Sequence, residues 1–394
     1  MTLPTRRPLG PATRLAWVVA ALAATLLTAA STDRYTWDLP TGWPEPMVPM
    51  HNPMTPEKVA LGRHLFYDKG LSADGTVACA TCHQQDKAFT DGLAVSHGIH
   101  GTTGVRSAMA LGNVAYLPTL TWTNPQLTSL EVQALIPLFG EQPVEMGMAG
   151  QEQVLFDKLA SSTTYSTLFT KAYPELAHQG RSQLFTLTTI TQALAAFQRS
   201  LLTFNSPYDR YTRDKDNAAI GQAAKRGEAL FFGEKMECYH CHGGLNFTDN
   251  LLHARLPYAE HGFHNTGLYN VDGRGAYPAA TPGVIEFTGL ASDAGRVRTP
   301  SLRNVGVTAP YMHDGSIATL EAVIRQHYAL GGRSTTQAAA GGNPLKSELI
   351  QGFDVTDGEV ADLVAFLHTL TDTRFLNDPR HSDPWSQKST NNRR

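Results

Sequence analysis

Two five-residue segments constrain this chain more than any other feature. Cys79-Ala80-Thr81-Cys82-His83 and Cys238-Tyr239-His240-Cys241-His242 share the pattern Cys-x-x-Cys-His, the attachment pattern of a c-type haem. On one turn of helix, cysteines three residues apart lie on the same face, so both sulfurs can reach the two vinyl groups of one porphyrin. The histidine that follows can then supply an axial nitrogen to the iron. The sequence therefore predicts two covalently bound haems.

A zinc site is the alternative, because two Cys-x-x-Cys pairs can supply four thiolates to one metal. Three features favour haem: a histidine follows each pair directly, the pairs are far apart in the chain, and the chain opens with an export-like segment. The sequence contains 4 cysteines, all within these motifs, so none remains for a disulfide or a catalytic thiol.

The first thirty residues have the pattern of a targeting segment. Arg6, Arg7 and Arg14 lie before or at the start of an apolar run from Leu15 to Ala30, which ends in the small residues Thr28-Ala29-Ala30. This is typical of a secretory signal. An uncleaved membrane anchor is the alternative, although the run is slightly short for a full span. Either way, the remainder is expected in the periplasm, and at a membrane only if this segment is uncleaved.

Length and composition indicate a globular protein of two domains. The 394 residues are 42% hydrophobic and 17% charged, which is ordinary for a soluble chain that can build sizeable cores. The net charge is −3 without a long basic run, which argues against nucleic acid as a partner.

The two halves form a weak internal repeat. Gly62-Arg63-His64-Leu65-Phe66 precedes the first motif, and Gly227-Glu228-Ala229-Leu230-Phe231 precedes the second. Phe-Thr-Asp follows each motif, at 89–91 and at 247–249. A repeated helix, haem motif and Phe-Thr-Asp indicates two cytochrome c-like domains in tandem. The predicted fold class is therefore mainly α with long loops, and no alternating strand pattern of any length is present.

The predicted organisation has five parts: a signal peptide or anchor at 1–30, an extended proline-rich lead-in at 31–54, an N-terminal cytochrome c-like domain at 55–205, a C-terminal one at 206–385, and a tail at 386–394. A turn at 206–208 would mark the boundary between the domains. Helices are expected from about Thr55 and over 151–159, 187–204, 218–232, 320–329 and 357–370, with a glycine- and proline-rich loop over 243–300.

The chain resembles the bacterial di-haem cytochrome c peroxidase and MauG superfamily. The resemblance is carried by Leu61–Phe66, both haem motifs, Val144–Met146, Arg298–Val305 and Thr308–Ser316. Within that superfamily, Asn113–Tyr116, Leu120–Pro125 and the proline-rich lead-in are most similar to the MbnH-type enzymes, MauG relatives that accompany a small copper-binding partner protein.

The resemblance implies different roles for the two haems. The N-terminal haem, held by His83, would be reactive, with its opposite face open to peroxide. His242 would hold the second, electron-transfer haem. Its sixth ligand, methionine in the peroxidases and tyrosine in MauG, is His327 when counted from His313 without a gap, or Tyr328 with one inserted residue. Both ligands donate more strongly than a thioether and lower the potential of the iron, as MauG-type chemistry requires.

The resemblance also implies roles for residues around the haems. Trp122 would lie between them and carry charge; the alternative is a core tryptophan. Glu145 would move a proton between the peroxide oxygens; the alternative is a solvated glutamate. His97 would cap the reactive haem as a distal ligand, unless it is an ordinary loop histidine. His313 would lie near the propionates of the second haem.

Members of the superfamily bind calcium between their domains. Main-chain oxygens of Thr308 and Pro310 match two of the ligand positions, and Ser107 takes the place of an asparagine at the third. Because a serine oxygen is a weaker calcium ligand, calcium is expected on the resemblance alone.

These features support three function hypotheses. The first is a peroxide-dependent di-haem oxidoreductase of MauG type. It would use a high-valent di-haem state to oxidise an aromatic residue on a periplasmic partner protein, a copper-binding one by the MbnH-type resemblance, through long-range electron transfer. The second is a di-haem cytochrome c peroxidase that reduces hydrogen peroxide to water with electrons from a small cytochrome. The third is a non-enzymatic di-haem electron carrier.

Overall fold

The computed structural model describes residues 35–333 and 342–386. Contacts between residues divide the chain into 1–36 and 37–394, and the second unit contains everything described below. The predicted signal segment at 1–30 and all but the first residue of the predicted tail at 386–394 lie outside the described residues. Nowhere in the described part of the chain is a helix both long and apolar enough to cross a bilayer.

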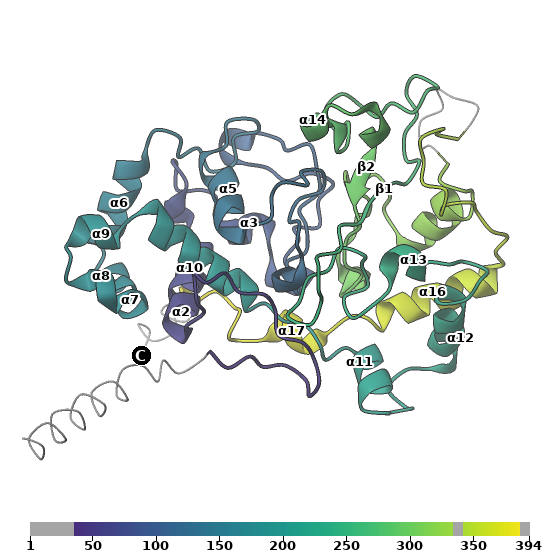
Figure 1. Cartoon of the computed structure of the whole chain (residues 1–394), viewed down its shortest axis with the longest axis horizontal. Helices are drawn as coiled ribbons and strands as arrows, with labels where there is room; N and C mark the ends of the chain where they lie inside the picture. Colours follow the sequence, from purple (N-terminus) through teal and green to yellow (C-terminus); the bar gives the residue numbers. More distant parts are fainter. Residues whose placement is uncertain (1–34, 334–341, 387–394) are drawn as a thin grey trace, which may run out of the picture. The chain divides into compact units, whose positions relative to one another are not determined.

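The first half is a series of helices and short helical turns joined by loops (Figure 1). Its elements are α2 (Pro56–Phe66), η1 (Lys69–Leu71), α3 (Cys79–Cys82), η2 (Gln85–Lys87), η3 (Ile99–Gly101), η4 (Val114–Tyr116), α4 (Leu130–Gln133), α5 (Leu135–Phe139), α6 (Glu152–Ser161), α7 (Thr163–Ala172), α8 (Pro174–Ala177), α9 (Arg181–Leu184) and α10 (Leu187–Arg199).

The second half adds one small sheet to the helices. Its elements are α11 (Pro207–Arg213), α12 (Gln222–Phe231), α13 (Tyr239–His242), β1 (Phe263–Asn265), α14 (Ile285–Thr288), η5 (Ala291–Asp293), β2 (Arg296–Arg298), η6 (Val305–Val307), α15 (Leu320–Ala322), the π-helix η7 (Val323–Tyr328), α16 (Asp357–His368) and α17 (Thr373–Asn377). Strands β1 and β2 pair antiparallel, with Phe263 opposite Arg298.

Local sequence explains where the main helices begin. The Thr55 side chain accepts a hydrogen bond from the Lys58 amide, and Pro56 occupies the first turn of α2, where a missing N–H costs nothing. Thr186 and Thr189 bond each other's backbone reciprocally at the start of α10. Thr356 and Glu359 do the same at the start of α16, so all three helices satisfy amides that would otherwise lack partners.

A repeated glycine sets the packing of the main helices. Helix α2 packs on α10 in the first half, and α12 packs on α16 in the second (Figure 1). A Cβ atom on Gly62 would lie 1.8 Å from the Ala193 carbonyl oxygen, and one on Gly227 would lie 2.0 Å from that of Asp362. The glycine of each repeat therefore lets two helix backbones touch, which brings the following aromatic residue into the core.

Each half has its own apolar core beside its Cys-x-x-Cys-His motif. In the first half, Phe66 and Phe197 belong to a buried cluster on which Cys79 packs. In the second half, Phe231 and Phe366 belong to a cluster on which Cys238 packs. The same helix pair thus supports the same motif twice.

Buried polar contacts join the two halves. The Asn113 amide donates to Asn246 Oδ1 at 3.0 Å, and Thr119 Oγ1 lies 2.6 Å from Asn250 Oδ1. These bonds are shielded from water, so losing one partner would leave a buried polar group unsatisfied. They hold the second motif's loop against the first half.

The predicted mainly helical fold is confirmed, with two corrections to its details. The turn expected at 206–208 is wrong, because Ser206 caps α11. The helix expected over 320–329 is divided between α15 and the π-helix η7. The structure also adds strands β1 and β2, which the sequence did not indicate because three residues are too few to show an alternating pattern. The domain boundary after residue 205 stays a prediction.

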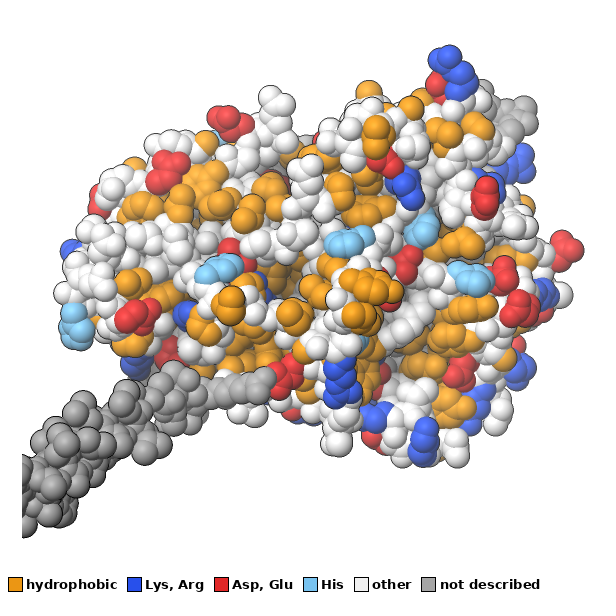
Figure 2. Space-filling view, in the orientation of Figure 1, with side chains coloured by type: hydrophobic (Ala, Val, Ile, Leu, Met, Phe, Trp, Pro, Cys, Tyr) orange, Lys and Arg blue, Asp and Glu red, His pale blue; other side chains and the backbone are white. Residues whose placement is uncertain are grey.

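On the face shown in Figure 2, acidic and basic side chains are interspersed, most densely over the α12 and α16 region. This mixture agrees with the small net charge of −3.

The glycine contact predicts a specific loss of stability. Replacing Gly227 with alanine should lower the free energy of unfolding by at least about 1–3 kcal/mol, because the added methyl group forces α12 away from α16. Urea denaturation of the purified protein, followed by circular dichroism, measures this change. Gly358 in α16 is the control, because it is exposed and its Cβ would meet no atom within 4 Å. A G227A variant as stable as G358A would contradict this packing.

Candidate active site with two histidine-bearing cavities

The histidines of both motifs are held in the same way. Nδ1 of His83 lies 2.7 Å from the carbonyl oxygen of Phe89, and Nδ1 of His242 lies 3.1 Å from that of Phe247. A carbonyl oxygen can only accept, so Nδ1 carries the proton and Nε2 keeps its lone pair. Each ring is therefore oriented as a metal ligand, with its second nitrogen bound to the backbone.

An unusual backbone conformation aims these carbonyl groups. Phe89 has a φ of 66° and Phe247 a φ of 51°, the left-handed region that residues with a Cβ rarely adopt. Such strain persists where the surrounding structure maintains it, often at functional sites. The repeated Phe-Thr-Asp thus corresponds to a repeated turn that carries the histidine's acceptor.

Each histidine faces its own cavity. The first cavity, of about 500 Å³, is lined by Cys79, Cys82 and His83 together with residues of the loops around 97, 122 and 145. The second cavity, of about 210 Å³, is lined by Cys238 and His242. A side chamber of about 150 Å³ shares Cys238 and His242 with the second cavity and adds Cys241.

The chemistry of these groups fits a covalently attached haem in each half. All four cysteines are free of disulfides, and burial raises the pKa of Cys79 and Cys238 to about 12, so they stay neutral thiols. Burial lowers the pKa of His83 and His242, which keeps them in the neutral form that ligates a metal. Because the two cysteine pairs line different cavities, they do not assemble one four-thiolate zinc site.

Only one of the two candidates for the sixth ligand lines the second cavity. Tyr328 lines the second cavity and the side chamber, together with His242. His327 is fully buried, with Nδ1 3.2 Å from the Arg333 carbonyl oxygen and Nε2 without a hydrogen-bond partner among the described residues, and it is not among the residues that line these two spaces. The π-helix η7 ends at Tyr328, and a π turn is an α-helix with one extra residue. An extra residue in this turn agrees with the count that allows one inserted residue and leads to Tyr328.

Trp122, Glu145 and His97 all border the first cavity. Trp122 also lines the second cavity, and its indole N–H donates to the Ser107 carbonyl oxygen at 2.9 Å. Burial raises the pKa of Glu145. Ile99 donates from its amide to the Glu145 carbonyl oxygen at 2.8 Å, which holds the His97 loop against Glu145. The His97 side chain is exposed, with Nδ1 3.4 Å from Thr103 Oγ1, so its role as a distal cap stays a prediction.

The structure brings the residues expected at calcium to one wall. Ser107, Thr308 and Pro310 all line the second cavity, as does His313. The Ser107 amide donates to the His313 carbonyl oxygen at 2.9 Å. His313 Nε2 is buried without a hydrogen-bond partner, and burial lowers the pKa of His313 to about 4. A neutral imidazole facing the cavity with an unused nitrogen fits a polar group of a bound cofactor; calcium stays a prediction.

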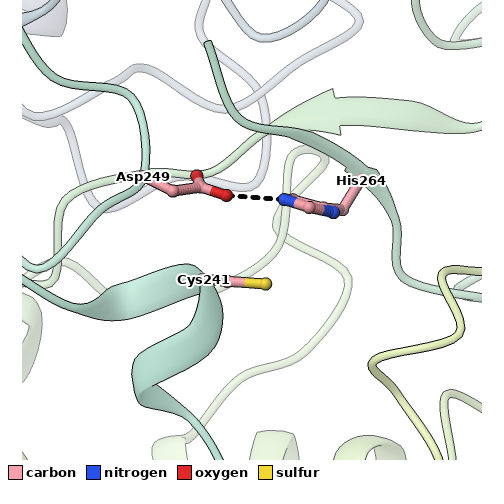
Figure 3. Close-up of side chains that lie close together, drawn as sticks. All are labelled: Cys241, Asp249 and His264. Atoms are coloured by element: carbon pink, nitrogen blue, oxygen red, sulfur yellow. Dashed lines mark hydrogen bonds and ion pairs between the residues drawn. The ribbon is translucent and has the colours of Figure 1, made fainter. Parts of the chain in front are cut away.

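Sequence reasoning missed a cluster beside the second motif. Cys241, Asp249 and His264 place one ligand atom each within 4.8 Å of one another (Figure 3). Asp249 Oδ2 lies 2.6 Å from His264 Nε2, and this bond raises the pKa of His264 to about 10. If Cys241 carries the porphyrin, its sulfur is used and only two donors remain, so the pair is part of the haem pocket's wall. Asp249 belongs to the Phe-Thr-Asp repeat, the one signal that could have found it.

Comparison with known proteins identifies the family. The model of the di-haem cytochrome c peroxidases matches residues 56–217. Over 324 residues the chain is 35% identical to the methylamine utilization protein MauG of Methylorubrum extorquens, covering 82% of this chain and 80% of that protein. The chain belongs to the di-haem cytochrome c peroxidase and MauG family.

Further relatives extend this result over nearly the whole chain. The cytochrome-c peroxidase IdrP1 of Denitromonas iodatirespirans is 33% identical over 388 residues, covering 94% of this chain and 95% of that protein. A crystal structure described as a MauG-like protein associated with microbial copper homeostasis is 47% identical, covers 89% of this chain and 99% of that one, and superposes with a TM-score of 0.84.

Family membership settles the general chemistry. The protein is an oxidoreductase of a family whose members act with peroxide and carry two c-type haems on cytochrome c-like domains. Because the relatives include both MauG proteins and cytochrome c peroxidases, the family alone leaves the electron donor open.

The two cavities predict independent haem attachment. Replacing both Cys79 and Cys82 with alanine should remove one covalent haem, and replacing Cys238 and Cys241 should remove the other, because each pair lines only its own cavity. Intact-mass measurement of protein matured in the periplasm would show one haem in each double variant and two in the wild type. Stoichiometric zinc in place of haem would contradict this assignment.

Proposed function

We propose that this protein is a peroxide-dependent oxidoreductase of MauG type that oxidises an aromatic residue on a partner protein by long-range electron transfer. Hydrogen peroxide takes up two electrons and two protons to give two molecules of water. The two electrons come from the partner's aromatic side chain, which is left oxidised and modified. When bound, the two haems would supply the reaction with peroxide and the relay of electrons.

One observation carries this proposal: of the two candidates for the sixth ligand, Tyr328 lines the second cavity together with His242, and His327 does not. The methionines of that lining, Met109 and Met312, do not occupy the position that the family count gives for the ligand. Burial raises the pKa of Tyr328 well above its usual range, so its phenolate needs a cation beside it, and a bound metal ion supplies one. If Tyr328 and His242 hold the second haem, a phenolate and a neutral imidazole would stabilise its oxidised iron and lower its potential. A haem of low potential is a poor acceptor from a small cytochrome, which favours the MauG-type reaction over the cytochrome c peroxidase alternative.

In the first cavity, His83 would hold the reactive haem and Glu145 would handle the proton of peroxide. The Glu145 carboxylate would take a proton from one peroxide oxygen and return it to the other, which helps the O–O bond break. Gly98 packs so closely that its Cβ would lie 2.2 Å from the Val144 carbonyl oxygen. This contact fixes the backbone that carries Glu145.

Trp122 would connect the two sites. Its ring lines both cavities, and its indole N–H is anchored to the Ser107 carbonyl oxygen. An indole held between two electron-transfer groups shortens each step, so we assign Trp122 as the relay between the haems.

The partner and the location follow from the same reasoning. We propose a periplasmic protein, exported by the segment at 1–30, with calcium held near Ser107, Thr308 and Pro310. The 47% identity to a protein associated with microbial copper homeostasis supports a copper-binding protein as the partner whose aromatic residue is oxidised.

Substitution of Tyr328 tests the proposed function. In the wild type, electron paramagnetic resonance should show one high-spin and one low-spin ferric haem, and both signals should fade with one equivalent of hydrogen peroxide. Y328M should raise the midpoint potential of the low-spin haem and restrict the loss of signal to the high-spin haem, because a thioether donates less than a phenolate.

His327→Gln is the matched control at the neighbouring position. It should leave the low-spin signal and the midpoint potential of the low-spin haem close to the wild-type values. A wild type with two low-spin haems that react with peroxide only after partial reduction would instead indicate the cytochrome c peroxidase. Continued inertness after reduction would indicate an electron carrier.

The raised pKa of Glu145 predicts a pH profile. The carboxylate can accept a proton only when ionised, so the rate of the first reaction with peroxide should rise with pH through this raised pKa and then level off. E145Q should abolish this step and slow the reaction by about 10²–10⁴-fold, as measured by stopped-flow absorbance. Glu141 is exposed in the same turn, and E141Q should keep the wild-type profile; an unchanged rate in E145Q would remove Glu145 from the mechanism.

A further inference from the structure

Arg298 is a buried cation that lacks a counter-ion. Three arginines in the described part of the chain are buried, with exposed fractions of 4% for Arg199, 2% for Arg298 and 4% for Arg303. Arg199 pairs with Glu131, and Arg303 pairs with Asp209. Arg298 makes no ion pair within 4.0 Å with any described residue. An unpaired charge inside a protein costs several kcal/mol, so this guanidinium differs from the other two.

The contacts of Arg298 are all with neutral groups. Its Nε–H donates to the Thr121 carbonyl oxygen at 3.2 Å, Nη1 to the Thr299 carbonyl oxygen at 3.2 Å, and Nη2 to the Met109 sulfur at 3.3 Å. A thioether sulfur is a weak acceptor, and a guanidinium has five N–H groups. These contacts therefore leave hydrogen-bonding capacity unused and provide no negative charge.

Asp249 acts on Arg298 electrostatically but forms no ion pair with it. Asp249 is the one acid whose charge raises the pKa of Arg298 against the effect of burial. Its Oδ2 is bonded to His264 at 2.6 Å, and its Oδ1 is buried without a hydrogen-bond partner in the described part of the chain. Since the bond to Asp249 raises the pKa of His264 to about 10, the aspartate and the histidine neutralise each other. Arg298 and this pair together therefore keep one net positive charge at neutral pH.

Arg298 lies where an anion can reach it. It lines both the second cavity and the side chamber, the two spaces that also contain Cys238, His242 and Tyr328. The covalent haem expected there carries two propionate carboxylates. A guanidinium matches the geometry of a carboxylate with two parallel hydrogen bonds.

We propose that Arg298 binds a propionate of the second haem and is the positive counter-ion of that carboxylate. This inference rests on the second haem of the proposed function, but not on the reaction with peroxide. Arg298 also holds the relay segment, because its backbone amide donates to the Trp122 carbonyl oxygen at 2.7 Å and its side-chain Nε–H donates to the Thr121 carbonyl oxygen at 3.2 Å. Arg298 is thus a positioning residue that joins haem and indole.

The test uses the full-length di-haem protein without peroxide and without a partner. R298Q removes the charge. R298K keeps the charge but loses the planar guanidinium that can form two parallel hydrogen bonds. R274Q is the control, because it removes the same charge from a side chain that is 87% exposed. Spectroelectrochemistry gives the midpoint potential of each haem, resonance Raman spectroscopy gives the propionate bending band, and the pyridine haemochrome assay gives the haem content.

R298Q should move the midpoint potential of the second haem to more negative values, because losing a nearby positive charge favours the ferric state. R298K should keep most of the potential but shift the propionate band, and R274Q should change neither. A purely structural role for Arg298 would not move that band. If R298Q fails to mature, R298K decides by itself.

A propionate band and a second-haem potential that stay unchanged in both R298K and R298Q would overturn the proposal. So would an equal shift in R274Q, which would show that only the net charge matters. These readouts do not depend on the outcome of the Tyr328 experiment: failure of the MauG-type reaction would leave them intact, and failure here would leave the peroxide chemistry untouched.

Discussion

The hydrogen bond between each motif histidine and a backbone carbonyl is the interaction on which the rest of the structure depends. It requires a phenylalanine in the left-handed region, at Phe89 and again at Phe247. That strain is sustained by the surrounding core, in which Phe89 and Phe247 are themselves buried. Because the bond leaves Nε2 free, it orients the histidine of each motif in the way that a metal ligand requires.

The packed helix pairs and the contacts between the two halves hold these histidines and their loops in place. Gly62 and Gly227 let α2 and α12 press against their partner helices, so the aromatic residues that follow fill the space behind each cysteine pair. Asn113, Thr119 and Arg298 then tie loops of one half to loops of the other. Trp122 lies on the segment these bonds restrain, which is why one indole can border both cavities. The proposed relay through Trp122 would depend on this rigidity.

Sequence reasoning is most specific where the chemistry is local. Covalent attachment demands cysteines and a histidine within one turn, so Cys79, Cys82, His83 and their counterparts were visible in the printed sequence. It failed where the role of a residue depends on which face of a helix it occupies or on contacts with residues far away in the chain. The sequence could not show which of His327 and Tyr328 lines the second cavity. The π-helix adds one residue to the turn and so changes which side chain lies on a given face, and no local sequence pattern indicates a π-helix. The strands β1 and β2 were missed because three residues carry no periodicity.

The sequence by itself determined the two haem motifs, the mainly helical class and the family, because each is written in short patterns that repeat along the chain. Only the tertiary structure decided which of two adjacent side chains faces the second cavity, that Trp122 borders both cavities, and that Arg298 alone among the buried arginines of the described residues lacks an acid. The physical reason is that these are relations between residues far apart in the chain. Burial and charge pairing exist only after the loops have packed.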